Sequence, residues 1–257
     1  YAHVMMDAVD QKAADLHTYS MSDKTADLYA FDSRFTGKSS AFKVTYEGKT
    51  YQFETRLAGR FNIYNTLGAI GAALSEGISM ETIAAAMKTF HSVPGRFELI
   101  DEGQSFTVVV DYAHTPDGLE KILTTAQEIT KGRILVVFGC GGDRDKMKRP
   151  IMGRIAARYA DVAIVTSDNP RTEDPETIVK EVAAGVEEVK AEKPSLQVEV
   201  VVDRRSAIQK AISLAKGDDI VLIAGKGHED YQILKDKTIH FDDREEARKA
   251  LKQSARF

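Results

Sequence analysis

Four loops in the second half of the chain carry side chains that could bind or transform a small ligand. The most informative is the loop 168–174, with the sequence Asp-Asn-Pro-Arg-Thr-Glu-Asp. Arg171 offers a planar fork of donors suited to a carboxylate or a phosphate, and Asn169 offers donors and acceptors. A short apolar run precedes the loop, and Pro175 begins a helical pattern after it. The loop therefore lies at the carboxyl end of a strand, where open α/β sheets bind ligands. The alternative is a plain helix-entry turn in which Arg171 pairs with Asp174.

The loop 139–150 is rich in glycine and in positive charge. Its glycines allow the backbone to approach a ligand closely. Its basic residues are Arg144, Lys146, Lys148 and Arg149. The G-x-G-x-x-G spacing of a dinucleotide site is absent, and no helical pattern follows the glycines directly. The plainer interpretation is a solvated run of charges. Cys140 could act as a nucleophile, but a buried structural thiol is the favoured prediction.

The loop 111–116 places an acidic and a basic side chain directly after another apolar run. Asp111 can accept hydrogen bonds from ribose hydroxyls, and His114 could contact a phosphate or hold the loop in shape. The alternative is a helix-capping turn led by Thr115.

The fourth loop, 224–232, places Lys226 between Gly225 and Gly227, so that backbone amides can face a ligand. Glu229 is suited to an ammonium group. The phosphate-binding pattern G-x-x-x-x-G-K-[ST] is absent from the chain, because a glycine follows Lys226.

The elements that must position these loops alternate between strands and helices. Strands are predicted near 106–111, 134–138, 162–166, 198–202 and 220–224, with helices near 117–130, 151–159, 176–191 and 205–215. Most of these strands are unbroken apolar runs, which indicates that both faces of the sheet are covered. The pattern predicts a Rossmann-like, doubly wound, mainly parallel α/β sheet. The four loops then meet at one edge, where Arg144, Asn169, Arg171 and Glu229 surround a cleft that fits an amino acid.

The first 95 residues follow a different pattern. The runs 42–46 and 51–55 alternate apolar and polar residues and predict a β-hairpin. Helices are predicted over 61–76 and over 79–90, the second capped by Ser79. In the first helix Asn65 could bind an adenine edge, although capping by Asn62 would explain the same segment. The segment 92–96 contains Pro-Gly and is predicted to join two domains, and a terminal hairpin is predicted over 231–241.

Composition limits the classes of protein to consider. The chain has 257 residues, 35 basic and 39 acidic, for a net charge of −4, so nothing indicates a nucleic-acid partner. Its single cysteine excludes an intrachain disulfide and fits a reducing compartment, which predicts a cytoplasmic location. Apolar runs are too short to span a membrane. The chain begins at Tyr1 without a methionine or a signal peptide, and we expect it to be a piece of a longer protein.

Six segments together resemble the Mur ligases of peptidoglycan synthesis, and among them the members that add meso-diaminopimelate. They are GRFNIYN (59–65), VPGRFE (93–98), VDYAHTPDGL (110–119), VFGCGGDRDKMKRP (137–150), DNPRTEDP (168–175) and AGKGHEDYQ (224–232). The resemblance implies a three-domain ATP-dependent amide ligase. Residues 1–95 would be the carboxyl-terminal part of its α/β ATPase domain, and residues 96–257 a Rossmann-like domain that binds the amino acid. The family's P-loop and carbamylated lysine would lie upstream, so the fragment alone is expected to be inactive.

The resemblance also implies substrates and site residues. The enzyme would be a cytoplasmic monomer that uses ATP and Mg²⁺ to join meso-diaminopimelate to UDP-N-acetylmuramoyl-L-alanyl-D-glutamate, for cell-wall growth and division. The ATP contacts would be Asn65, Arg96 and Asp111. The diaminopimelate contacts would be Arg144, Asp168, Asn169, Pro170, Arg171, Gly225 and Glu229. No metal ligand is assigned in this chain, and His114 is the one candidate catalytic residue.

Three other functions stay open at this point. One is another amide ligase of the superfamily, such as a folylpolyglutamate synthetase, although the loop 168–171 argues against it. Another is a nicotinamide oxidoreductase, which rests on the doubly wound sheet and the glycines 139–142. The third is a non-catalytic module that binds an amino acid.

Overall fold

The computed structural model describes residues 2–9, 16–36 and 39–254. The chain divides into two compact units, Tyr1–His91 and Ser92–Phe257. The boundary lies four residues before the 95/96 boundary expected from the sequence, because Ser92–Gly95 pack with the second unit. None of the described helices is both long and apolar enough to cross a lipid bilayer. Each unit is described separately below.

The first unit is built around a sheet with the strand order β1-β2-β3-β4. Its elements are α1 (Ala2–Ala8), β1 (Tyr19–Ser20), β2 (Leu28–Thr36), β3 (Ser39–Tyr46), β4 (Lys49–Thr55), α2 (Arg60–Ser75) and α3 (Met80–Thr89). The predicted hairpin is present, as β3 and β4 pair antiparallel. Its turn residues Glu47 and Gly48 both have positive φ, 48° and 74°, which matches the twist of the strands.

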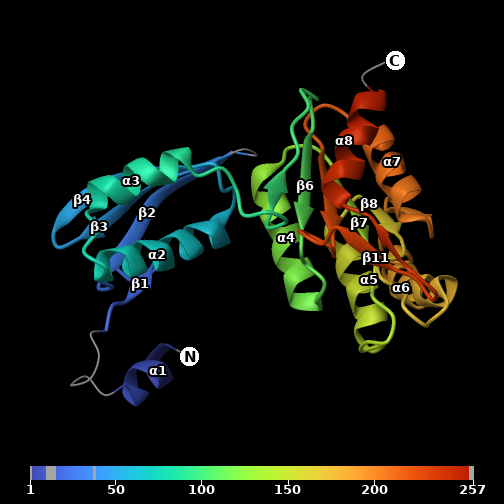
Figure 1. Cartoon of the computed structure of the whole chain (residues 1–257), viewed down its shortest axis with the longest axis horizontal. Helices are drawn as coiled ribbons and strands as arrows, with labels where there is room; N and C mark the ends of the chain where they lie inside the picture. The colour runs from blue at the N-terminus through green and yellow to red at the C-terminus, as the bar shows by residue number, and fades with distance from the viewer. Residues whose placement is uncertain (1, 10–15, 37–38, 255–257) are drawn as a thin grey trace. The chain divides into compact units, whose positions relative to one another are not determined.

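Helices α2 and α3 pack on one face of this sheet (Figure 1). Their inward residues, such as Leu67 and Ile83, join the inward residues Phe42 and Phe53 in one core. Both helices were predicted. Ser79 caps α3 as expected, since its side chain accepts the backbone N–H of Thr82.

The second unit contains a six-stranded sheet with the order β5-β6-β10-β7-β8-β9. Strands β6 (Thr107–Asp111), β10 (Ile220–Ala224), β7 (Ile134–Phe138), β8 (Val162–Val165) and β9 (Gln197–Val200) are parallel. The edge strand β5 (Glu98–Leu99) is antiparallel to β6. The mainly parallel sheet predicted from the sequence is therefore confirmed. All five residues of β7 and of β10 are buried, as their unbroken apolar sequences indicated.

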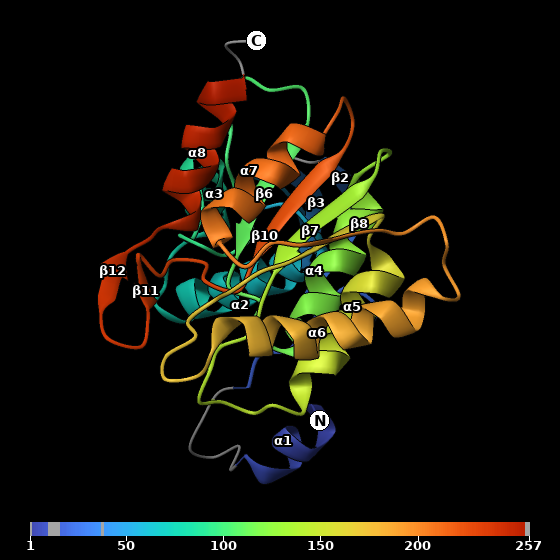
Figure 2. The same ribbon diagram turned by 90° about the vertical axis from the view of Figure 1, so that its right-hand side faces the viewer.

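Helices cover both faces of this sheet (Figure 2). One face carries α4 (Pro116–Ile129), α5 (Lys148–Tyr159) and α6 (Pro175–Lys190). The other carries α7 (Arg204–Leu214) and α8 (Asp243–Ser254), whose alanines and leucines pack on the inward valines and isoleucines of the strands. The sequence did not predict α8. Helix α5 also begins earlier than expected, at Lys148, so a helix does follow the glycine-rich loop closely.

The parallel strands end at one edge of the sheet, which brings the loops after β6, β7, β8 and β10 together. The chain after β10 forms the predicted terminal hairpin, in which β11 (Tyr231–Ile233) pairs antiparallel with β12 (Thr238–His240). The hairpin is joined to the loop after β8, because the backbone N–H of Arg171 donates to the carbonyl of Ile233 at 3.1 Å. All four chemistry-bearing loops are therefore held in one place.

Candidate functional site

A pocket of about 670 Å³, here called the strand-end pocket, opens where the four loops meet. Its lining includes six of the seven residues expected to bind the amino acid: Arg144, Asp168, Asn169, Arg171, Gly225 and Glu229. Pro170 is buried and is not part of the lining. His114, Lys148 and Tyr231 also line the pocket. Segments more than eighty residues apart in the sequence therefore contribute to one cavity.

The glycine-rich loop and the loop 168–174 are hydrogen-bonded to each other. The N–H of Gly142 donates to the carbonyl of Asn169 at 2.9 Å, and the hydroxyl of Thr172 donates to Asp143 at 2.7 Å. A Cβ on Gly142 would lie 1.9 Å from the carbonyl oxygen of Pro170, so only glycine fits there. Gly142 therefore serves close packing between two backbones, whereas Gly141 lines the pocket, so the approach of a ligand to the glycine loop stays a prediction.

Arg171 is held at the mouth of this loop pair. Its guanidinium donates to the carbonyl of Gly142 at 2.9 Å, and its backbone has a φ of 53°. A non-glycine residue in this left-handed region is strained by about 1–3 kcal/mol, a cost that clusters at ligand sites. Asp174 does not pair with Arg171, as the plainer interpretation required. Asp174 instead caps α6 by accepting the N–H of Thr177.

Arg144 and Arg171 leave their charge available to a ligand. Arg144 is exposed and donates to the carbonyl of Asp143, and within residues 39–254 neither arginine forms an ion pair with a carboxylate. The pocket also holds the carboxylates of Asp168 and Glu229. A zwitterionic ligand with both carboxylate and ammonium groups fits this mixture of charges.

Arg149 was expected on the cationic surface and is instead completely buried. It pairs with Glu173 at 2.9 Å and with Glu181 at 2.7 Å. The hydrogen bond from Arg149 holds the pKa of Glu173 at about 2, well below the usual 4.5. Arg149 therefore supports the loops from beneath and is not a ligand contact.

Cys140 is buried, as the structural interpretation predicted. Its Sγ lies 3.6 Å from the sulfur of Met152, and burial raises the pKa of the thiol to about 12. A thiol with that pKa is almost fully protonated near neutral pH, which argues against a nucleophile.

Lys226 was expected in a loop whose backbone faces a ligand, yet its side chain is completely buried. Its ammonium group donates to Asn169 Oδ1 at 2.9 Å and to the carbonyl of Tyr231 at 2.7 Å. Burial lowers the pKa of Lys226, and the charge of Asp168 opposes this shift. The sequence shows a lysine between two glycines, but it does not show which residues that lysine contacts.

The residues expected to contact ATP fall in both units. Asn65 is exposed on α2 of the first unit, where its side chain donates to Asn62. In the second unit the guanidinium of Arg96 lies over the ring of Tyr112, 4.6 Å from its centroid. Asp111 accepts the N–H groups of Phe97 and Ala113, each at 2.7 Å, and burial raises its pKa. Asp111 thereby fixes the backbone beside Arg96.

His114 lies on the pocket wall beside the same aromatic ring. Its Nδ1 is 2.8 Å from the carbonyl of Tyr112, and its ring contacts the Tyr112 ring at 4.6 Å. Thr115 caps α4 by accepting the N–H of Gly118, as the capping interpretation predicted. The capping interpretation is therefore confirmed, and His114 still lines the pocket, so its contact with a phosphate stays a prediction.

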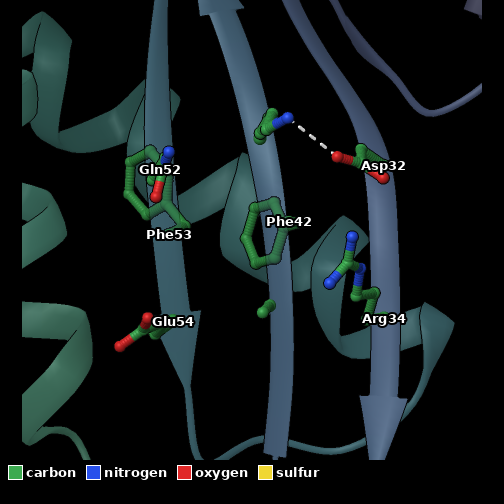
Figure 3. Close-up of a pocket in the computed structure, with 8 residues that line it drawn as sticks. Asp32, Arg34, Phe42, Gln52, Phe53 and Glu54 are labelled. Atoms are coloured by element: carbon green, nitrogen blue, oxygen red, sulfur yellow. Dashed lines mark ion pairs between the residues drawn. The ribbon is translucent and has the colours of Figure 1, made fainter.

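The first unit has a smaller pocket of about 260 Å³ on the outer face of its sheet (Figure 3). Asp32 and Lys43 form an ion pair of 2.8 Å across it, and Arg34 lies nearby with Gln52 and Glu54. Its charges are of both signs and partly paired. In the described residues no group of three or more His, Cys, Asp or Glu side chains could hold a metal ion.

Comparisons with known proteins agree with this geometry. The family model described as "Mur ligase, glutamate ligase domain" matches residues 95–227, which are more than half of the chain. The chain belongs to the Mur ligase family. The model described as "Mur ligase middle domain" matches residues 1–73. The family resemblance seen in the six sequence segments is thereby confirmed.

Several members of the family are close in sequence. The UDP-N-acetylmuramoyl-L-alanyl-D-glutamate–2,6-diaminopimelate ligase of Clostridium botulinum is 49% identical over 92% of this chain and 48% of its own length. The ligase of the same name from Geobacillus kaustophilus is 50% identical over 94% and 48%. A solved structure of such a ligase superposes with a TM-score of 0.71 at 35% identity, over 99% of this chain and 51% of that one. The chain spans about half the length of the curated relatives it matches.

Proposed function

We propose that this chain is the carboxyl-terminal half of an ATP-dependent ligase that joins meso-diaminopimelate to UDP-N-acetylmuramoyl-L-alanyl-D-glutamate in peptidoglycan synthesis. Residues 1–95 would complete the central ATP-binding domain, and residues 96–257 would bind the amino acid. The observation that carries the proposal is the meeting of Arg144, Arg171 and Glu229 in the strand-end pocket. The names of the relatives that are about half identical support it independently.

The amino acid is recognised by its charges. Arg171 and Arg144 would bind carboxylate groups of meso-diaminopimelate, Glu229 would bind an ammonium group, and Asn169 would donate to a carboxylate. Asp168, Pro170 and Gly225 would complete the shape of the site. A charge-assisted pair is worth about 1.5–3 kcal/mol. Lysine lacks one carboxylate, so it would leave Arg171 without its partner.

The reaction converts a poor electrophile into a good one. The γ-carboxylate oxygen of the D-glutamyl group attacks the terminal phosphorus of ATP, which gives an acyl phosphate and releases ADP. The diaminopimelate amine then attacks the acyl carbon, loses a proton, and displaces inorganic phosphate to leave the amide. In this chain Arg96, Asp111 and Asn65 would contact ATP, and His114 could meet the transferred phosphate. Mg²⁺ is a family expectation; in the described residues no group of three or more His, Cys, Asp or Glu side chains could hold it, and no magnesium ligand is assigned to this chain.

Solution properties follow from the same proposal. We expect the complete ligase to be a monomer in the cytoplasm, where its nucleotide substrates are made. We also expect the chain by itself to bind the amino acid without forming the amide, since the phosphate-binding half would be missing.

Titration calorimetry on the chain tests the amino-acid site directly. The expected result is binding of meso-diaminopimelate, binding of L-lysine that is weaker by about tenfold to a hundredfold, and no binding of NAD. Equal affinity for both amino acids would contradict the role of Arg171. Binding of NAD without meso-diaminopimelate would favour an oxidoreductase instead.

A further inference from the structure

The ammonium group of Lys226 lies under the wall of the strand-end pocket, surrounded by residues that line it. It is 2.9 Å from Asn169 Oδ1, 3.5 Å from Glu229 Oε2 and 3.7 Å from Asp168 Oδ1. The side chain is completely buried, so it cannot itself be a surface contact for a ligand. Lys226 therefore touches three proposed ligand contacts and is hidden behind them.

Lys226 and the backbone of Ile233 together decide which way the Asn169 amide faces. Asn169 Oδ1 receives two hydrogen bonds, from Lys226 Nζ at 2.9 Å and from the backbone N–H of Ile233 at 3.0 Å. An ammonium group and a backbone N–H can only donate, so the atom between them must be the oxygen. The Nδ2 group then faces Glu229 Oε2 at 3.0 Å. Asn169 can offer only N–H donors to the pocket.

Lys226 also balances the negative charge of the site. Asp168 and Glu229 are both mostly buried, at 10% and 17% exposure of their side chains, and they lie 3.7 and 3.5 Å from the same ammonium group. Without a cation between them, two poorly hydrated carboxylates would repel each other and the carboxyl group of Glu229 would move. The charge of Lys226 is therefore needed to keep Glu229 beside Asn169.

We propose that Lys226 is a positioning residue for the acceptor amino acid, which fixes the donor face of Asn169 and the carboxylate of Glu229 so that they meet a carboxylate and an ammonium group respectively. The proposal rests on the proposed function and extends it, since it assigns a role to a side chain that does not touch the ligand. Lys226 acts through Asn169 and Glu229, so its removal should weaken the binding of the acceptor amino acid more than the binding of the other substrates.

Steady-state kinetics of the complete ligase test this role. Lys226→Met removes the ammonium group and keeps a buried chain of similar length, whereas Lys226→Gln keeps a donor without the charge. Lys131→Met is the matched control, because Lys131 is exposed in the turn between α4 and β7. The Michaelis constant, KM, is measured separately for meso-diaminopimelate, ATP and the UDP-linked substrate.

The expected result for Lys226→Met is a rise of about 10- to 100-fold in the KM for meso-diaminopimelate. The two other KM values should stay within about twofold of the parent enzyme. Lys226→Gln should show a smaller rise, and Lys131→Met should show none. An unchanged KM for meso-diaminopimelate, or an equal rise for all three substrates, would overturn the positioning role. If Lys226→Met does not fold, Lys226→Gln alone decides by the same criterion. A parent enzyme that does not use meso-diaminopimelate would instead overturn the proposed function.

Discussion

Two groups of basic side chains lie at the carboxyl edge of the second unit, and they differ in how their charge is used. The rim group consists of Arg144 and Arg171, which face the strand-end pocket and donate to backbone carbonyls. The buried group consists of Arg149, Arg204 and Lys226, which are completely buried and lie beside carboxylates. Both groups look alike in the sequence, where they are basic residues in or beside polar loops.

The difference separates basic residues that are open to a ligand from basic residues that stabilise the fold. A buried cation whose charge is matched by protein carboxylates has little left to offer a ligand, and it is costly to disturb. A rim cation bonded only to carbonyls keeps its charge for an incoming anion, and its removal should cost little stability. Lys226 combines the two, because it is buried but bonds to Asn169 and Tyr231, which line the strand-end pocket. The following changes test this division, in order of decreasing effect.

Asp243→Asn should have the largest effect, on stability alone. Asp243 and Arg204 are both completely buried and pair at 2.7 Å, so the change leaves an unmatched buried cation. The free energy of unfolding of the second unit should fall by about 3–5 kcal/mol. Urea unfolding measures it. The matched control is Asp117→Asn, whose partner Lys121 is exposed, with an expected loss below about 1 kcal/mol. Equal losses would remove the distinction between buried and exposed pairs.

Arg171→Ala should affect catalysis and leave the fold in place. In the complete ligase we expect kcat/KM for meso-diaminopimelate to fall by about tenfold to a hundredfold, since a carboxylate loses its charged partner. The urea midpoint should not move. Arg154→Ala is the control, because Arg154 pairs with Glu188 on the helices α5 and α6. An unchanged kcat/KM would refute the assignment of Arg171.

Glu173→Gln should show that the ion pair between Glu173 and Arg149 makes stability depend on pH. The pKa of Glu173 is about 2 in the folded chain against a usual 4.5, so its pairing with Arg149 stabilises the fold above pH 4.5. That contribution is lost as the pH falls from 4.5 towards 2. The variant should therefore be less stable than the parent at neutral pH, and the gap should narrow at about pH 3. Urea unfolding at both pH values is the measurement, and a gap of constant size would contradict it.

Cys140→Ala should have the smallest effect. The thiol is buried against Met152 and takes no part in the pocket, so we expect a loss of about 1 kcal/mol in stability. Calorimetry should give the same affinity for meso-diaminopimelate as the parent chain. A large loss of binding would mean that the thiol belongs to the site.

The parallel sheet and its ligand edge could be predicted because they depend on local patterns. Unbroken apolar runs such as 134–138 and 220–224 are readable one segment at a time, and the rule that ligands bind at strand ends does the rest. Helix α8 was missed because its sequence is mostly charged, and two of its acidic residues, Asp243 and Glu246, are buried together with Ala247, Ala250 and Leu251. Strand β2 was missed because a bulge between Phe31 and Arg34 interrupts its alternation.

The candidate site was predicted in its membership but not in its layering. The residue types predicted Arg171 and Glu229 as ligand contacts, because their chemistry is the same in any fold, and both line the strand-end pocket. Whether Arg149 and Lys226 face water or carboxylates depends on partners as far away as Glu181 and Asp168, which no local pattern reveals. Burial of a charge is a property of tertiary contacts, so it becomes visible only in the assembled structure.

The close packing of Gly142 against the carbonyl of Pro170 bears on which sequence positions in this loop pair can carry information about the ligand. This glycine is demanded by the crossing of two backbones, whatever molecule the pocket receives. Glycine at this position therefore reports the packing of the two loops and does not by itself indicate which ligand the pocket takes. Position 171 has no such crossing of backbones, although its φ of 53° restricts the residues that fit there. Under the proposed function, a different side chain at position 171 would change which acceptor amino acid the pocket prefers.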